Sequence, residues 1–300
     1  MSILVNWLES LHEEMKVSSK CVRVRNRKST CVFCIEACKQ NAFEIKDHLL
    51  ILDRNKCTMC GDCILICPLS AIKGVISNRF FVGGSLLFNH NYVPSIKELL
   101  IYKKRGMTSI QVSHHPLTVE WKMVVSQSND YLQILDEDSI EVVQKGKEEV
   151  ISRRAFLGSF QKEGRQLAKS MAPASWRMEK DDWKITRYYP DYQFFTVKLN
   201  RKKCTLCQAC FTLCPENVFQ IKDLLLVIQN EKCVYCTSCT DVCPTNAIEI
   251  VRGVKRINDN QENVHLKECI VCEHTFYTFN VETVKCHVCA NRDLDWLSPY

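Results

Sequence analysis

Cysteine is the residue type most able to do chemistry here, because the chain holds 20 of them among 300 residues. Thiolates bind zinc and iron–sulfur clusters, and thiols also pair as disulfides, so spacing has to decide between these uses. Seven cysteines recur at a constant offset of 176 residues. They are Cys31, Cys34, Cys38, Cys57, Cys60, Cys63 and Cys67, followed by Cys207, Cys210, Cys214, Cys233, Cys236, Cys239 and Cys243. The neighbouring residues repeat as well, which indicates an internal duplication.

The run C-x2-C-x2-C-x3-C-P occurs three times, at Cys57 to Pro68, Cys204 to Pro215 and Cys233 to Pro244. This spacing is typical of bacterial proteins that bind two clusters side by side. Structural zinc also uses paired CxxC motifs, but it does not need interleaved groups of four with a trailing Cys-Pro. The spacing therefore favours iron–sulfur clusters over zinc, and disulfides fit it less well than zinc does.

On these motifs, both copies resemble 2[4Fe–4S] ferredoxin domains, over about 110 of the 300 residues. The resemblance implies small α+β domains that carry electrons. In that family the first three cysteines of one run share a cluster with the last cysteine of the other. It thus implies one cluster on Cys204, Cys207, Cys210 and Cys243, and its neighbour on Cys233, Cys236, Cys239 and Cys214.

The first copy departs from this pattern, because the offset places Lys28 where a ligand is expected. We infer that Cys21 replaces it, giving one cluster on Cys21, Cys31, Cys34 and Cys67 and another on Cys57, Cys60, Cys63 and Cys38. The alternative is that Cys21 is an unrelated thiol and the site holds a three-iron cluster or none. The intervening basic residues, Arg23, Arg25, Arg27 and Lys28, would raise the potential of an adjacent cluster. Lys39 also replaces the proline of the other runs.

Four further cysteines lie near the C-terminus, as Cys269-x2-Cys272 and Cys286-x2-Cys289. Two CxxC turns joined by an expected hairpin over 275–284 resemble a zinc ribbon, so we expect a zinc ion on these four thiolates. A fifth iron centre, a rubredoxin-like iron or unligated thiols are the alternatives. We interpret His274 and His287 as bystanders.

The segment 79–145 contains no cysteine, and its pattern predicts a small βαβαβ unit. We expect strands at 86–88, 109–112 and 140–143, and helices at 96–104 and 119–135. It has no glycine-rich phosphate loop, so a spacer or docking role is favoured. His114 and His115 are interpreted as a loop and helix-cap pair.

The expected fold is therefore α+β, with two ferredoxin-like modules flanking a small α/β domain. The predicted parts are an N-terminal helix (1–20), the first ferredoxin-like domain (21–78), the α/β domain (79–145), a helix and linker (146–195), the second ferredoxin-like domain (196–256) and a zinc-ribbon-like element (257–300). Aromatic residues of the linker, among them Trp183, are expected to shield clusters or pack modules together. The twin-arginine-like sequence Arg153-Arg154 lies mid-chain without an apolar stretch after it, so we do not expect it to direct export.

The formal net charge of +6 is weak evidence for nucleic-acid binding, because each oxidised cluster with four thiolates adds about −2. The sequence shows no signal peptide pattern and no long apolar stretch, which predicts a cytoplasmic protein without membrane insertion. We expect a non-enzymatic electron carrier or electron-transfer subunit with four [4Fe–4S] clusters, one zinc ion and a redox partner protein. The alternative is an accessory or maturation factor that docks to a redox enzyme or delivers clusters.

Overall fold

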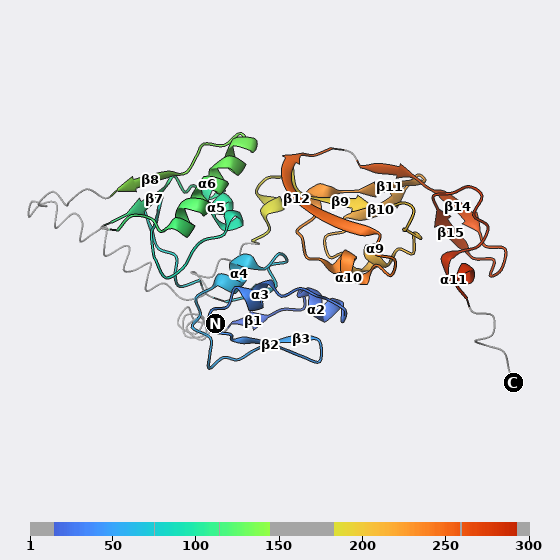
Figure 1. Ribbon diagram of the computed structural model, residues 1–300, viewed down its shortest axis with the longest axis horizontal. Coiled ribbons are helices and arrows are strands. Elements are labelled where there is room, and N and C mark those ends of the chain that lie inside the picture. Colours follow the sequence, from blue (N-terminus) through green and yellow to red (C-terminus); the bar gives the residue numbers. More distant parts are fainter. Residues whose placement is uncertain (1–14, 75, 114, 145–182, 259, 293–300) are drawn as a thin grey trace, which may run out of the picture. The chain divides into compact units, whose positions relative to one another are not determined.

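The computed structural model describes residues 15–74, 76–113, 115–144, 183–258 and 260–292 (Figure 1). The chain divides into two compact units. The first comprises residues 1–21 and 32–188, and the second comprises residues 22–31 and 189–300. The fold is α+β, as expected, with short helices and small sheets.

The first ferredoxin-like module lies mainly in the first unit. Its strands β1 (Lys16–Val17) and β4 (Ile72–Lys73) pair antiparallel, and β2 (Phe43–Lys46) and β3 (Leu49–Leu52) form a hairpin. Two short helices, α3 (Phe33–Glu36) and α4 (Asp62–Ile66), contact each other. Each helix follows a cysteine-rich loop, so the module's elements position the thiols. The helix α2 (Val22–Arg25) belongs to the second unit.

The α/β domain contains each element that the sequence predicted. Its helices are α5 (Ile96–Lys104) and α6 (Val119–Ile134). Its parallel strands are β6 (Ser85–Leu87), β7 (Ser109–Val112) and β8 (Glu141–Gln144), and a short antiparallel strand, β5 (Phe81–Val82), extends the sheet beside β6.

Both helices of the α/β domain begin with a capping side chain. Ser95 accepts a hydrogen bond from the Glu98 N–H, and Thr118 accepts one from the Trp121 N–H. These caps satisfy N–H groups that a helix leaves unpaired at its start. Trp121 is fully buried and donates its indole N–H to the carbonyl of Tyr92 at 2.7 Å. The domain therefore has a core of its own.

The second ferredoxin-like module repeats the plan with longer strands. The strands β9 (Tyr192–Leu199) and β12 (Ile248–Arg256) pair antiparallel, and α9 (Ala209–Leu213) and α10 (Ser238–Val242) follow its cysteine loops. Its hairpin strands are β10 (Phe219–Lys222) and β11 (Leu225–Ile228). A third strand, β13 (Gln261–Asn263), pairs with β11. This strand falls within the segment that we assigned to the ribbon, but its hydrogen bonds place it in the module's sheet.

The C-terminal element differs from the expected hairpin. The strands that pair are β14 (His265–Glu268) and β15 (Thr275–Thr278), which flank the first CxxC turn. The expected hairpin over 275–284 is therefore wrong, because residues 275–278 pair with the strand before the first CxxC turn, and the turn at 280–283 leads to no second strand in the described residues. A short helix, α11 (His287–Ala290), carries the last cysteine.

The expected N-terminal helix over 1–20 is corrected at its end, where Lys16 and Val17 form β1 and Met15 is buried. The rest of that helix lies outside the described residues. So do the Arg153-Arg154 sequence, most of the 146–195 segment and His114. Among the described residues, none of the helices combines the length and the apolarity needed to cross a bilayer.

Candidate metal centres

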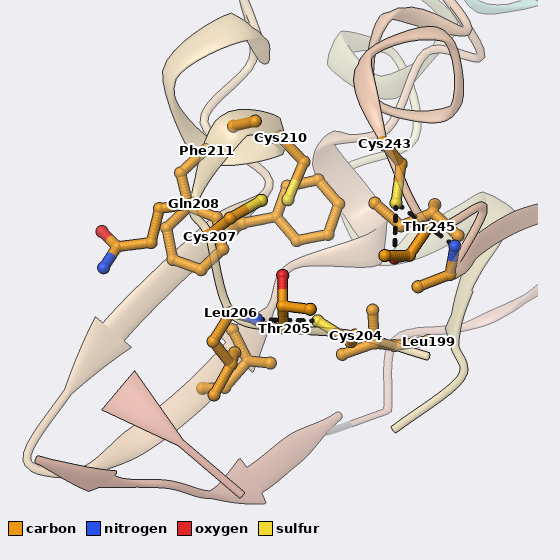
Figure 2. A pocket seen from close by; sticks show the side chains of 15 residues that line it. Leu199, Cys204, Thr205, Leu206, Cys207, Gln208, Cys210, Phe211, Cys243 and Thr245 are labelled. Carbon is orange, nitrogen blue, oxygen red and sulfur yellow. Dashed lines mark hydrogen bonds between the residues drawn. The ribbon is translucent and has the colours of Figure 1, made fainter. Parts of the chain in front are cut away.

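Three groups of four cysteines each line a cavity. In the second module one cavity is lined by Cys204, Cys207, Cys210 and Cys243, and another by Cys214, Cys233, Cys236 and Cys239. In the first module a third is lined by Cys38, Cys57, Cys60 and Cys63. Figure 2 shows the first of these groups, with Cys204 and Cys207 from the loop before α9, Cys210 from α9 and Cys243 at the end of α10. The structure thus brings together the interleaved sets that the resemblance implied.

Residues with positive φ shape each three-cysteine loop. In each loop one of them stands directly before the second cysteine and the other directly after it. Their φ angles lie between 52° and 86°. The six residues are Met59, Gly61, Leu206, Gln208, Tyr235 and Thr237. At Gly61 a Cβ atom would lie 2.7 Å from the Cα of Ile76, so a side chain does not fit there. Turns of this kind point successive N–H groups toward a concave side, which favours an anionic group such as a thiolate-bound cluster.

The last cysteine of every run receives the same hydrogen bond. A backbone N–H four residues later donates to its Sγ at 3.2–3.4 Å, from Ala42 to Cys38, Ala71 to Cys67, Val218 to Cys214 and Ala247 to Cys243. Burial would raise the pKa of Cys243, but backbone N–H groups and the Thr245 hydroxyl outweigh it and lower that pKa. Hydrogen bonds to sulfur stabilise the negative thiolate and raise the potential of a bound cluster.

Burial acts in the opposite direction on the loop cysteines. It raises the pKa of Cys210 and of Cys236 to about 12 and that of Cys233 to about 11, and negative neighbouring thiolates add to the effect in each case. These thiols therefore hold their protons at neutral pH unless a cation replaces them. Four partly or fully buried sulfur donors around one cavity suit iron in a [4Fe–4S] cluster.

The fourth predicted set is Cys21, Cys31, Cys34 and Cys67. Cys31 belongs to the second unit and the other three to the first, so their joint ligation stays a prediction. The turn that carries Cys21 is nevertheless similar to the turn that carries Cys204, although Cys21 is the third residue after the entering residue and Cys204 is the fourth. In each turn the N–H of the entering residue donates at 2.8 Å to the carbonyl of the alanine that precedes the strand after the last cysteine. The two hydrogen bonds run from Ser18 to Ala71 and from Asn200 to Ala247. The N–H of each cysteine then donates back to that entering residue, at 3.0 Å and 2.9 Å.

The loop after Cys21 differs from the other three loops. It forms α2, and the buried Arg23 donates from Nε to the carbonyl of Cys31 at 2.7 Å. Arg25, Arg27 and Lys28 are exposed. We call residues 22–30 the basic excursion. It is a folded segment in which one arginine fixes the backbone beside Cys31.

The C-terminal cysteines form a separate and tighter group. The Sγ atoms of Cys269, Cys272, Cys286 and Cys289 all lie within 4.8 Å of one another. A tetrahedral metal ion with sulfur at about 2.3 Å separates its thiolates by about 3.8 Å, and the Cys272 and Cys286 sulfurs are 3.9 Å apart. A four-iron cube holds its thiolates farther apart, because iron and sulfide lie between them. The group therefore fits one metal ion.

Electrostatics within this group also favour a cation. The backbone N–H of Cys286 donates to Cys269 Sγ at 3.3 Å, and this hydrogen bond, with others, lowers the pKa of Cys269 to about 6. The pKa of Cys289 is raised to about 12, mainly by a hydrogen bond with the Cys272 thiol and also by the other neighbouring thiols. His274 Nδ1 lies 2.7 Å from the Cys272 carbonyl.

Sequence reasoning missed the contacts that the α/β domain makes around the first module. Asn91 lines the same cavity as Cys57 and Cys60. Lys39, which replaces the proline of the other runs, was the sequence feature that could have indicated these contacts. Its Nζ donates to the carbonyl of Asn91 at 2.7 Å. A lysine in place of the proline thus connects the module to the α/β domain.

The family model described as "4Fe-4S binding domain" matches residues 50–73 and 226–249. The two matches lie 176 residues apart, which is the offset of the duplication, and each contains one complete run of four cysteines. A comparison with curated proteins finds no match. The chain thus contains two 4Fe–4S binding domains and a separate group of four cysteines near its C-terminus.

Proposed function

We propose that this protein relays single electrons through four [4Fe–4S] clusters, two in each module, to or from a partner oxidoreductase. The observation that best supports the proposal is the grouping of twelve cysteines around three cavities, each with three thiols from one run and one from the other. When bound, a cluster of this kind gains and loses one electron. With four thiolates per cluster, each iron is fully ligated and none is open to a substrate.

The fourth cluster of the proposal uses Cys21, Cys31, Cys34 and Cys67. Its support is the similar position of Cys21 and Cys204 in a turn beside the strand after the last cysteine, and the N–H donated to Cys67 Sγ, which matches the other three runs. Positive charge on the excursion, from Arg25 among others, would favour the reduced state of this cluster. It is therefore the proposed point of exchange with a specific partner.

We further propose that the C-terminal group binds one zinc ion with a structural role. Zinc has no redox chemistry, and four thiolates close its coordination shell. The element has little core of its own, since Leu266, Ile270 and Val288 are exposed. A metal ion would supply the stability that packing does not.

The proposal is tested by anaerobic purification of the whole chain, analysis of iron, sulfide and zinc, and EPR during a redox titration. The expected result is about sixteen iron and sixteen sulfide per chain, with reversible one-electron signals. Stoichiometric zinc in both modules with little iron would contradict it. A cluster-delivery factor would instead lose its iron to an apo-acceptor protein, whereas a relay keeps its iron through repeated redox cycles.

A further inference from the structure

The matching cysteine loops 57–63 and 233–239 differ in charge at one position. Asp62 lies between Cys60 and Cys63 and begins α4, and the matching residue of the second module is Ser238, which begins α10. The Ser238 hydroxyl donates to the carbonyl of Leu213 at 3.3 Å. The duplication thus provides a neutral reference for the position that carries a carboxylate in the first module.

The carboxylate of Asp62 is paired with a buried arginine. Arg79 Nη1 lies 2.5 Å from Asp62 Oδ1. The Arg79 side chain is 4% exposed, whereas the Asp62 side chain is 18% exposed. Charges removed from water in this way are costly unless they are well paired, so the contact is strongly held once formed.

Arg79 is in turn fixed by the α/β domain. Its Nε and Nη2 donate to the two oxygens of Glu98 at 2.8 Å and 3.1 Å, and its guanidinium lies 4.0 Å from the ring centroid of Tyr92. Burial alone would lower the pKa of Arg79, but Glu98 and Asp62 outweigh it and raise that pKa, so the guanidinium stays charged. Glu98 itself stands in the capped first turn of α5. The carboxylate beside the cysteine loop is therefore positioned from another domain.

Two lysine contacts show that the α/β domain holds this side of the module at more than one point. Lys97 Nζ donates to the carbonyl of Cys67 at 3.0 Å, and Lys39 reaches Asn91 as described above. The domain therefore contacts the ligand segments directly and does more than space the two modules.

We propose that Asp62 and Arg79 are positioning residues that set the reduction potential of the cluster bound by Cys57, Cys60, Cys63 and Cys38. The inference rests on the proposed function. The carboxylate opposes an added electron, and the guanidinium offsets part of that opposition in a site largely removed from water. Removing the carboxylate should raise this potential, and removing the guanidinium should lower it.

The decisive experiment replaces Asp62 with the residue of the second module. In the full-length Asp62→Ser protein, Arg79 keeps both contacts with Glu98, so folding should be retained. An EPR redox titration should show one midpoint raised, with the equilibrium between oxidised and reduced cluster shifted about tenfold, which is 59 mV for a one-electron couple. The other midpoints should not move.

Two further variants complete the test. Ser238→Ala changes the matching position without changing charge, and all midpoints should stay in place. Arg79→Gln should lower the midpoint that Asp62→Ser raises; if this variant does not fold, Asp62→Ser alone decides. Full iron content with unmoved midpoints in Asp62→Ser would overturn this inference alone, whereas a wild-type chain without iron would overturn the proposed function as well.

Discussion

Thr30 donates two hydrogen bonds to the carboxylate of Asp241, from its N–H at 2.9 Å and from its hydroxyl at 2.8 Å. The two residues are 211 positions apart, and both belong to the second unit. The segment that separates Cys21 from the other first-copy cysteines is thus held by α10 of the second module. Asp241 also accepts from Thr237 Oγ1 at 3.1 Å, so its orientation is fixed.

The contact between Thr30 and Asp241 should protect the basic excursion from proteolysis. Thr30→Val removes the hydroxyl donor, at a cost of about 1 kcal/mol, which would make local opening about fivefold more frequent. Limited trypsin cleavage after Arg25 or Arg27 should accelerate by about that factor. Thr30→Ser keeps the hydroxyl and should cleave at the wild-type rate. Equal rates in both variants would show that the hydrogen bond does not hold the segment.

Cys21→Ser should remove or convert one cluster. Iron content should fall by about one to four atoms per chain, with a three-iron signal in EPR if the cluster is converted and not lost. The matched control is Cys204→Ser, which replaces the cysteine at the corresponding turn of the second module. An unchanged iron count in Cys21→Ser alone would refute the assignment of Cys21 as a ligand.

Cys286→Ser should abolish zinc binding without changing the iron content. The reason is that one of four thiolates is lost from a group whose sulfurs lie within 4.8 Å. Metal analysis of the purified protein gives both numbers. His274→Ala is the control and should keep about one zinc per chain. If His274→Ala lost the metal as well, the histidine would have to be a ligand.

Zinc affinity at the C-terminal group should depend on pH. The pKa of Cys289 is raised to about 12, so its proton must leave when the metal binds, and this proton alone should lower the affinity about tenfold for each pH unit of acidification. The pKa of Cys269 is lowered to about 6, so this thiol adds its proton to the dependence only below that pH, where the profile steepens. Competition with a coloured chelator between pH 5 and pH 8 measures this. A flat profile would contradict it.

The parts of the fold that could be predicted are those specified by nearby residues. The C-x2-C-x2-C-x3-C spacing is local, and the family resemblance that it carries implied the grouping of Cys204 to Cys210 with Cys243. The helices of the α/β domain were predictable because Ser95 and Thr118 cap them directly before the apolar pattern begins.

The parts that could not be predicted depend on contacts between distant residues. Asp62 and Arg79 are 17 positions apart, and the N–H of Trp183 donates to Ser70 Oγ across 113 positions. Neither pair carries a local pattern that identifies its partner. The misplaced C-terminal hairpin has a similar cause, because β-branched residues at 275–284 favour a strand but do not specify which strand pairs with it.

The link between the second module and the C-terminal element is a single residue. The strand β13 ends at Asn263 and β14 begins at His265, and Val264 between them is 1% exposed and packs in the core of the second module with Leu226 and Ile228. Its N–H donates to the carbonyl of Leu224 at 2.9 Å. The link has no slack, so the four-cysteine element and the second module should tumble in solution as one body. A force on the element would therefore act directly on the sheet that borders the cluster loops.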